Sequence, residues 1–363
     1  DGPADYCSVT SVLGGFDQQI SRQRLYATAN VDYSRYKNAT QLNNTGYGLK
    51  AGWDWATIEN LTGTLYATAN RNLANFYGAA DIPVTSRNMV KTDQVGGSAK
   101  LGGEGLLSLE AAYAHSRVDY SAPEYVVYKS SADTASIGGF YRAGAFLRLG
   151  LALRGTRTET PNAVPLGTGG YASNTTNGSN VDLLADYKLS EQTGFKGRLS
   201  YTRQTNSRPE IEDFSGVTGG LTATYAPTAK LAFELDYVRD AGTNATFFNI
   251  PGAQPNTGTL GLTQGNKTVD LVTLTGKYAA TAKINANASY AYRYGKTNNT
   301  QTGATSFTDT DRLHTFALGL TYDITRAIQL GCSYAYENRD ATGNPGFSYS
   351  ANVMGCSAQL TLR

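Results

Sequence analysis

The sequence predicts an all-β fold, a transmembrane barrel of antiparallel strands, and two observations carry this prediction. Apolar and polar residues alternate with a period of two along most of the chain, as expected of strands with one apolar and one polar face. The connections between these segments are short and long in turn, which is the usual layout of short periplasmic turns and long extracellular loops. A soluble β-sandwich or propeller would not repeat this alternation of loop lengths, so we expect a location in the bacterial outer membrane of a Gram-negative cell.

The composition agrees with a barrel. The chain has 40 Gly and 25 Tyr but 2 His and 2 Met. No segment approaches the roughly 18 consecutive apolar residues of a membrane helix. The mean hydropathy is −0.35, which suits a barrel because lumen-facing residues are polar. The formal charge of +2 is near balance, and without a Lys/Arg-rich run we expect no nucleic-acid partner.

Residues 146–154 show the alternation most clearly. Leu149 and Leu151 fall on one face of an extended segment, whereas Arg148 and Arg154 fall on the other. The leucines are therefore expected to face lipid and the arginines the lumen. Many apolar faces elsewhere end in Tyr or Trp, which is typical of the aromatic girdle at a membrane interface.

The pattern predicts 17 strands within one barrel domain spanning residues 1–363. Their expected ranges are 6–19, 22–37, 46–58, 60–78, 88–102, 106–121, 128–142, 145–160, 178–189, 194–208, 213–227, 230–246, 267–281, 283–298, 311–325, 327–342 and 349–363. Long loops are expected near 37–46, 78–88, 160–180, 246–267 and 298–311.

An odd number of strands conflicts with the even counts of bacterial single-chain barrels. If the C-terminus is periplasmic, segment 6–19 runs from the outside to the periplasm, and the chain would begin outside the cell. We therefore expect one further strand upstream, for a total of about 18. The alternative is that 6–19 is not a barrel strand, which leaves 16.

The three cysteines are too few and too dispersed for a metal site. Folding a hairpin about residue 344 brings Cys332 opposite Cys356, with both side chains pointing outward. A cross-strand disulfide and a pair of free buried thiols are both compatible with this placement. Cys7 has no assigned partner.

Inward-facing charged residues form the candidate site. Several come from a narrow arc of neighbouring strands and are expected to line a substrate path; they are Arg142, Arg148, Arg154, Asp182, Asp186, Lys188, Lys196 and Arg198. They suit a partly basic ladder that guides an anionic or hydroxylated chain, or alternatively a salt-bridged lumen that stabilises the wall. If the passing molecule is neutral, Tyr26, Tyr36 and Tyr66 are the better candidates for contact with it.

Residues 21–55, which read SRQRLYATANVDYSRYKNATQLNNTGYGLKAGWDW, resemble the EpsL-type outer-membrane proteins of exopolysaccharide operons, within a broader β-barrel porin family. The resemblance rests on residues 21–24, 35–36, 42–45 and 53–55, and extends less specifically along most of the chain. In that family an additional strand precedes the region matching 6–20. The resemblance implies a role in moving exopolysaccharide across the outer membrane.

These observations together predict a porin-like conduit for export of an exopolysaccharide, with no cofactor and no metal. Its expected partners are membrane lipid, the polysaccharide and a periplasmic export protein that supplies direction, because the chain has no nucleotide-binding motif. Loops 160–180 and 246–267 are the candidates for a constriction. A general or small-solute diffusion porin is the second interpretation, and a structural or adhesive surface barrel is the third. Enzymatic function is not expected, since His115 and His314 are the only histidines and no catalytic motif accompanies them.

Overall fold

The computed structural model describes residues 5–361, apart from 59, 75–86, 104, 167–168, 210, 242–265, 300–306 and 343–347. The described chain is all-β with two short 3₁₀-helices, η1 (Thr40–Leu42) and η2 (Pro123–Tyr128). The strands are β1 (Cys7–Ile20), β2 (Gln23–Tyr36), β3 (Asn44–Ala56), β4 (Leu61–Leu73), β5 (Met89–Leu101), β6 (Leu107–Tyr120), β7 (Ser130–Ala143), β8 (Leu147–Pro165), β9 (Tyr171–Lys188), β10 (Thr193–Asn206), β11 (Phe214–Thr228), β12 (Leu231–Ala241), β13 (Asn266–Ala279), β14 (Ile284–Asn299), β15 (Phe307–Asp323), β16 (Ile328–Thr342) and β17 (Tyr349–Leu360). The expectation of 17 strands is confirmed for these residues.

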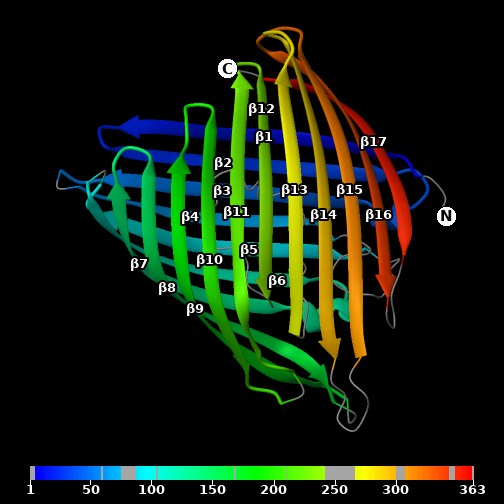
Figure 1. Ribbon diagram of the computed structural model, residues 1–363. Coiled ribbons are helices and arrows are strands. Elements are labelled where there is room, and N and C mark those ends of the chain that lie inside the picture. Colours follow the sequence, from blue (N-terminus) through cyan, green and yellow to red (C-terminus); the bar gives the residue numbers. More distant parts are fainter. Residues whose placement is uncertain are drawn as a thin grey trace.

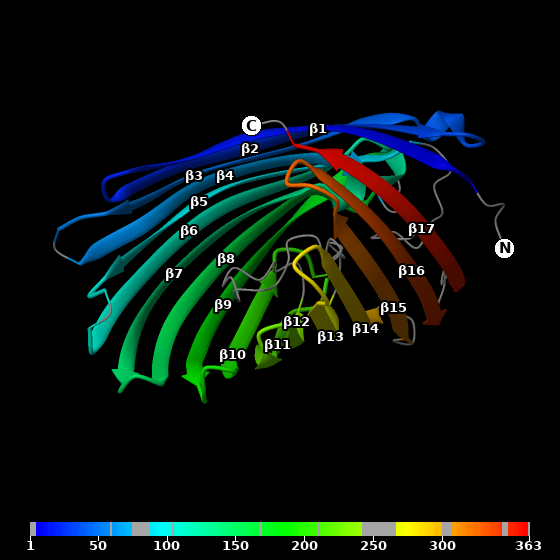
Figure 2. The ribbon, with the colours of Figure 1, turned by 90° about the horizontal axis from the view of Figure 1, so that it is seen from above.

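All strands belong to one antiparallel sheet in chain order. Each strand from β2 to β16 pairs with the strand before it and the strand after it. The sheet curls strongly, so that β2–β6 pass behind β11–β16 and cross them at a steep angle (Figure 1). Seen from above, the strands follow one curved wall (Figure 2). Among the described residues, β1 pairs with β2 alone and β17 with β16 alone.

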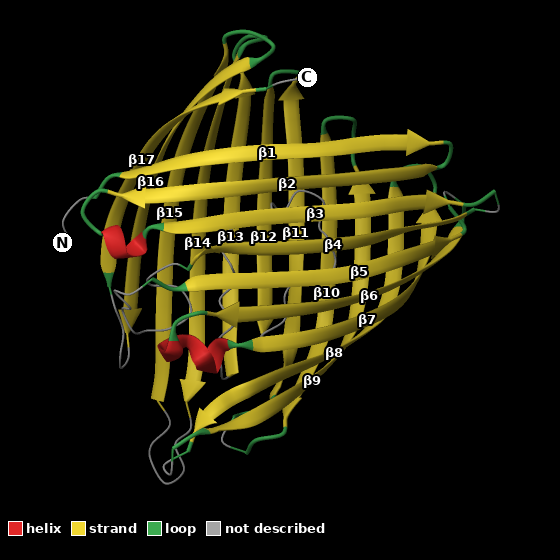
Figure 3. Ribbon diagram, turned by 180° about the vertical axis from the view of Figure 1, so that it is seen from behind, coloured by secondary structure: helices red, strands yellow, loops and turns green. Residues whose placement is uncertain are grey.

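The two ends of the sheet differ in the length of their connections. At one end, the short-turn end, consecutive strands are joined by two to five residues, as at Ser21 and Arg22 between β1 and β2. Ser21 has a φ of 56°, a left-handed conformation that lets two residues reverse the chain. At the opposite end, the long-loop end, η1 joins β2 to β3 and η2 joins β6 to β7 (Figure 3).

The expectation of a long loop at residues 160–180 is wrong. β8 and β9 extend far beyond their neighbours and leave only residues 166–170 between them. The side chains of Thr156, Thr158 and Thr160 are buried rather than solvated, and the Thr156 hydroxyl lies 3.1 Å from that of Thr134. Pro161 falls within a register shift between Thr160 and Val164. The expected constriction loop at 246–267 lies almost wholly outside the described residues.

The predicted facing of the strands is confirmed in β8. Leu149, Leu151 and Leu153 are 43%, 55% and 57% exposed on the outer face. Arg148 and Arg154 lie on the inner face, where the Arg154 side chain is 2% exposed. No helix within the described part of the chain is long and apolar enough to cross a membrane.

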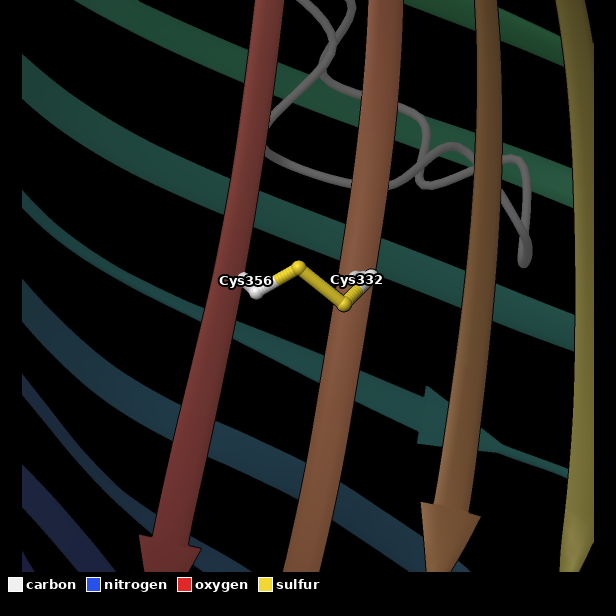
Figure 4. Close-up of a disulfide and its surroundings, with 2 residues drawn as sticks. All are labelled: Cys332 and Cys356. Carbon is white, nitrogen blue, oxygen red and sulfur yellow. A yellow bond between two sulfur atoms is a disulfide. The ribbon is translucent and has the colours of Figure 1, made fainter.

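Cys332 on β16 and Cys356 on β17 face each other in the strand ladder and form a disulfide (Figure 4). Of the two states that the sequence left open, the structure therefore has the disulfide. Both residues lie on the outer face, alongside Leu330 and Met354. Cys7 is exposed and is a free thiol.

Candidate functional site

The inner face of β8–β12 is polar and closely packed. Thr202 donates a hydrogen bond to the Asn180 side chain at 2.6 Å, and its hydroxyl lies 2.7 Å from that of Thr218. Thr222 donates to Asp236 at 2.6 Å. The threonines are at most 2% exposed. This part of the wall is therefore a lattice of hydrogen-bonded side chains, in which buried polar groups satisfy one another.

A cluster of charged residues, the first arginine–aspartate triad, lies within this lattice. Asp182 on β9 accepts hydrogen bonds from Arg154 Nε at 3.1 Å and Arg154 Nη2 at 3.3 Å, across from β8. Arg198 on β10 places its Nη1 3.8 Å from the same carboxylate and donates to the Ser200 hydroxyl at 2.8 Å. The Asp182 side chain is 0% exposed. The three residues carry one net positive charge and are removed from bulk water.

A second triad repeats this arrangement on β14–β16. Asp311 accepts a hydrogen bond from Arg293 Nη2 at 2.6 Å on one side and from Arg339 Nε at 2.8 Å on the other. The central carboxylate again belongs to the middle strand of three, and the cluster again carries one net positive charge. Tyr349 on β17 donates a hydrogen bond to Glu337 beside it. The sequence analysis did not foresee this cluster, because the pairing of its residues depends on strand register.

The remaining charged candidates lie near the short-turn end. Arg142 and Arg148 face each other in the β7–β8 ladder, and Arg148 forms an ion pair with Glu110 on β6. Asp186 stands between Arg148 and Lys196 in the ladders of β8, β9 and β10. The cations of this group thus stand beside carboxylates. This arrangement resembles the stabilising wall that was the alternative interpretation more than an open basic ladder.

Lys188 and the three tyrosines have different surroundings. Lys188 lies 4.0 Å from Glu191 at a turn and is largely exposed. Tyr26, Gly52, Tyr66 and Gly96 follow one another across the inner face of β2–β5. A Cβ atom on either glycine would overlap the neighbouring tyrosine ring. These rings therefore lie along the wall, filling the space that the glycines leave.

Tyr66 also accepts a hydrogen bond from Gln94 at 3.1 Å, whereas the Tyr26 ring lies 5.1 Å from the Arg24 guanidinium. Tyr36 lies apart from both, at the long-loop end of β2, opposite Cys7. The structure thus brings two of the three tyrosines into one row and leaves the third elsewhere.

An aromatic cluster at the long-loop end was missed by the sequence analysis. Tyr120 of β6 contacts Tyr125 and Tyr128 of η2, with ring centroids 5.4 and 6.4 Å apart. Tyr125 is 1% exposed. Asn162 of β8 donates a hydrogen bond to the Val126 carbonyl at 3.4 Å and ties η2 to the inner face. Burial raises the pKa of the Tyr125 hydroxyl. The segment PEYVVY gave no periodic signal from which this packing could be foreseen.

The histidines occupy the outer face. His115 Nδ1 lies 2.9 Å from Asp133, which also accepts a hydrogen bond from Tyr113 at 2.6 Å. His314 lies 2.8 Å from the Tyr290 hydroxyl. Within the described residues, no three His, Cys, Asp or Glu side chains form a group that could hold a metal ion.

No protein-family model and no curated protein matches this chain. Its fold is similar to those of solved outer-membrane proteins. The FrpB iron transporter from Neisseria meningitidis aligns with a TM-score of 0.55 and 9% identity over 93% of this chain and 60% of its own. The alcaligin outer-membrane receptor FauA from Bordetella pertussis aligns with a TM-score of 0.51 and 14% identity over 99% of this chain and 64% of its own. This chain therefore spans about three fifths of the length of these proteins.

The fold defines a class of protein, the β-sheet membrane proteins of the bacterial outer membrane. The predicted location is confirmed, and this chain is an outer-membrane protein. The resemblance to EpsL-type proteins is wrong, because the structural neighbours are metal transporters and receptors. The same finding speaks against export of exopolysaccharide through a porin-like conduit and against a general diffusion porin. It also speaks against a polysaccharide and its export protein as partners. The error arose because short motifs in alternating strands recur in barrels for physical reasons.

Proposed function

We propose that this chain forms the barrel wall of an outer-membrane uptake protein for a specific small ligand, of the metal-chelate class. The observation that carries the proposal is the pair of arginine–aspartate triads on the inner face. In each triad two guanidinium groups surround one carboxylate, and the two triads lie six strands apart. The likeness to an iron transporter and to a receptor for alcaligin supports the same direction of transport.

The chemistry of the triads favours an acidic, oxygen-rich ligand. Guanidinium groups bind carboxylate-like oxygens through paired, charge-assisted hydrogen bonds. Chelators of hard metal ions present such oxygens. Most polar side chains of the wall already form hydrogen bonds with one another. A ligand is therefore recognised mainly by the few cationic side chains that still have a free hydrogen-bond donor. Arg293 is the more accessible of these cations, since its side chain is 19% exposed, and no described residue accepts a hydrogen bond from its Nε.

Uptake of labelled ferric chelates tests this function. A strain that lacks the protein, and the same strain carrying the wild-type chain, are compared on a panel of chelates under iron limitation. We expect one chelate to lose most of its uptake in the deletion strain and to regain it on complementation. The variant Arg293→Gln should lower that uptake, whereas Gln192→Ala in a turn should not. Equal uptake of every chelate by the deletion and parent strains would contradict the proposal.

We propose further that the sheet closes into a barrel of about 18 strands through one strand between β1 and β17. Sixteen consecutive antiparallel pairings give β1 and β17 the same direction. A strand that is antiparallel to both therefore fits between them. β1 is exposed on both faces, with Val12 at 73% and Leu13 at 65%. Its pairing with β2 along its whole length argues against the alternative of 16 strands.

Hydrogen exchange in lipid bilayers tests the closure. Lipid offers no partner for unpaired backbone groups, so a closed barrel must protect every strand. We expect the amides of β1 and β17 in the complete protein to exchange as slowly as those of β5. Fast exchange confined to β1 and β17 would show that the seam is open.

A further inference from the structure

A cationic surface patch, which we call the β4–β7 patch, lies on the outer face at the long-loop end. It consists of Arg71, Lys91, Asp93, Arg117, Asp119 and Lys129. Its residues occupy the outward positions of β4, β5 and β6, directly beyond the apolar residues of the same faces, and Lys129 immediately precedes β7. Below it, Leu65, Val95 and Tyr113 are about half exposed on the lipid-facing wall. The patch therefore stands where an apolar membrane interior gives way to lipid headgroups.

The strand register places two like charges side by side in this patch. Arg71 and Lys91 are directly opposite each other in the β4–β5 ladder. Directly opposed side chains have Cβ atoms about 5 Å apart, and like charges in this position are destabilising unless something compensates them. Lys91 has a carboxylate partner, Asp93, at 2.8 Å. Arg71, on the other side, lies beside Tyr47 in the β3–β4 ladder.

The carboxylates of the patch do not balance its cations. Asp119, which lies directly opposite Lys91 in the β5–β6 ladder, serves both Lys129, at 2.7 Å, and Arg117, at 3.7 Å. The four cations and two carboxylates leave two positive charges. An ordinary ion-paired surface would place an acid opposite Arg71, whereas this one presents a second cation.

We propose that the β4–β7 patch binds the phosphate group of a lipid headgroup in the outer leaflet, with Arg71 and Lys91 as its principal contacts. A phosphate monoester carries up to two negative charges, which matches the excess, and its oxygens accept charge-assisted hydrogen bonds from guanidinium and ammonium groups. The acyl chains of the same lipid would lie along Leu65, Val95 and Tyr113. A lipid rather than a free phosphate is the occupant because the apolar wall continues directly beneath the patch.

Retention of phosphatidic acid by the purified protein tests the proposal. The complete protein is placed in phosphatidylcholine bilayers that contain phosphatidic acid, and bound lipid is measured by native mass spectrometry. We expect Arg71→Gln together with Lys91→Gln to weaken retention by about tenfold, while Arg71→Lys keeps most of it because the charge remains. Arg203→Gln, which removes an outward-facing arginine on β10, is the matched control and should retain wild-type binding.

Two outcomes would overturn the inference. Equal retention by the double variant and the wild type would show that the patch does not hold the phosphate. Displacement of phosphatidic acid by inorganic phosphate alone would show that the site takes a free anion. Unchanged heat-modifiability of the double variant on gels verifies that it is folded, which is expected because both side chains are exposed.

Discussion

The carboxylate of Asp182 accepts two hydrogen bonds from the guanidinium of Arg154, and the two side chains are 0% and 2% exposed. The pair joins β8 to β9 in the middle of the inner face, and Arg198 approaches the same carboxylate from β10. Removing one partner of a buried ion pair is strongly destabilising, because the other charge is then buried without a counter-charge.

Replacing Asp182 by Asn should therefore lower the free energy of unfolding by about 3–5 kcal/mol, because Arg154 and Arg198 lose their shared counter-charge. Urea-induced unfolding in lipid vesicles measures this change. Asp186→Asn on the same strand is the control, since Asp186 is partly exposed and should cost less than about 1 kcal/mol. Equal stability of both variants would mean that the triad does not stabilise the wall.

Replacing Leu151 by Arg should cost about 2–4 kcal/mol if the residue lies near the membrane midplane, because a cation then faces hydrocarbon. Leu149→Arg should behave in the same way, and Gln192→Arg in a short turn should be nearly neutral. Refolding yields in vesicles report the difference. Wild-type stability of both leucine variants would contradict the outward facing of β8.

Thiol alkylation of the unfolded protein under non-reducing conditions should label one cysteine per chain, Cys7, and three after reduction. The physical reason is that Cys332 and Cys356 are bonded to each other across β16 and β17. Peptide mass spectrometry identifies the labelled sites. Labelling of Cys332 or Cys356 before reduction would rule out the disulfide in the isolated protein.

Gly52→Val should destabilise the protein by about 1–3 kcal/mol, because its side chain would overlap the Tyr26 ring. The cost should fall when Tyr26→Ala is combined with it, since the space then becomes free. A double-mutant cycle measures this coupling. Additive costs would show that the ring does not lie over the glycine.

The turn between β2 and β3 should loosen in acid. Backbone N–H groups of Ala39 and Asn38 donate to the Asp5 carboxylate, both at 2.9 Å, and hold its pKa below the ordinary value. This contribution to stability is present above the ordinary pKa of an aspartate, about 3.9, and is lost as the pH falls through the lowered folded value. We expect amide protection at Asn38 and Ala39 to decrease in that range. Asp5→Asn should show no such dependence on pH.

The sequence by itself determined the strand pattern and its facing. Alternation is a local property, so the leucines of 146–154 could be assigned to lipid and the arginines to the lumen without a structure. Counting residues around a hairpin likewise placed Cys332 opposite Cys356. The sequence-based prediction failed at residues 160–180. The threonine and asparagine residues there suggested a solvated loop, although they continue two paired strands.

Only the tertiary structure decided which side chains meet across several strands. Asp311 reaches both Arg293 and Arg339, and Gly52 lies between Tyr26 and Tyr66, because register aligns residues from different strands. Register depends on turn lengths and bulges summed over several hairpins, and a shift of one residue moves every side chain to the other face. The packing of η2 could not be predicted for the same reason. Tyr125 is buried between residues of two different strands, Tyr120 of β6 and Asn162 of β8. The sequence therefore sets the faces of the wall, and the pairing of strands sets its sites.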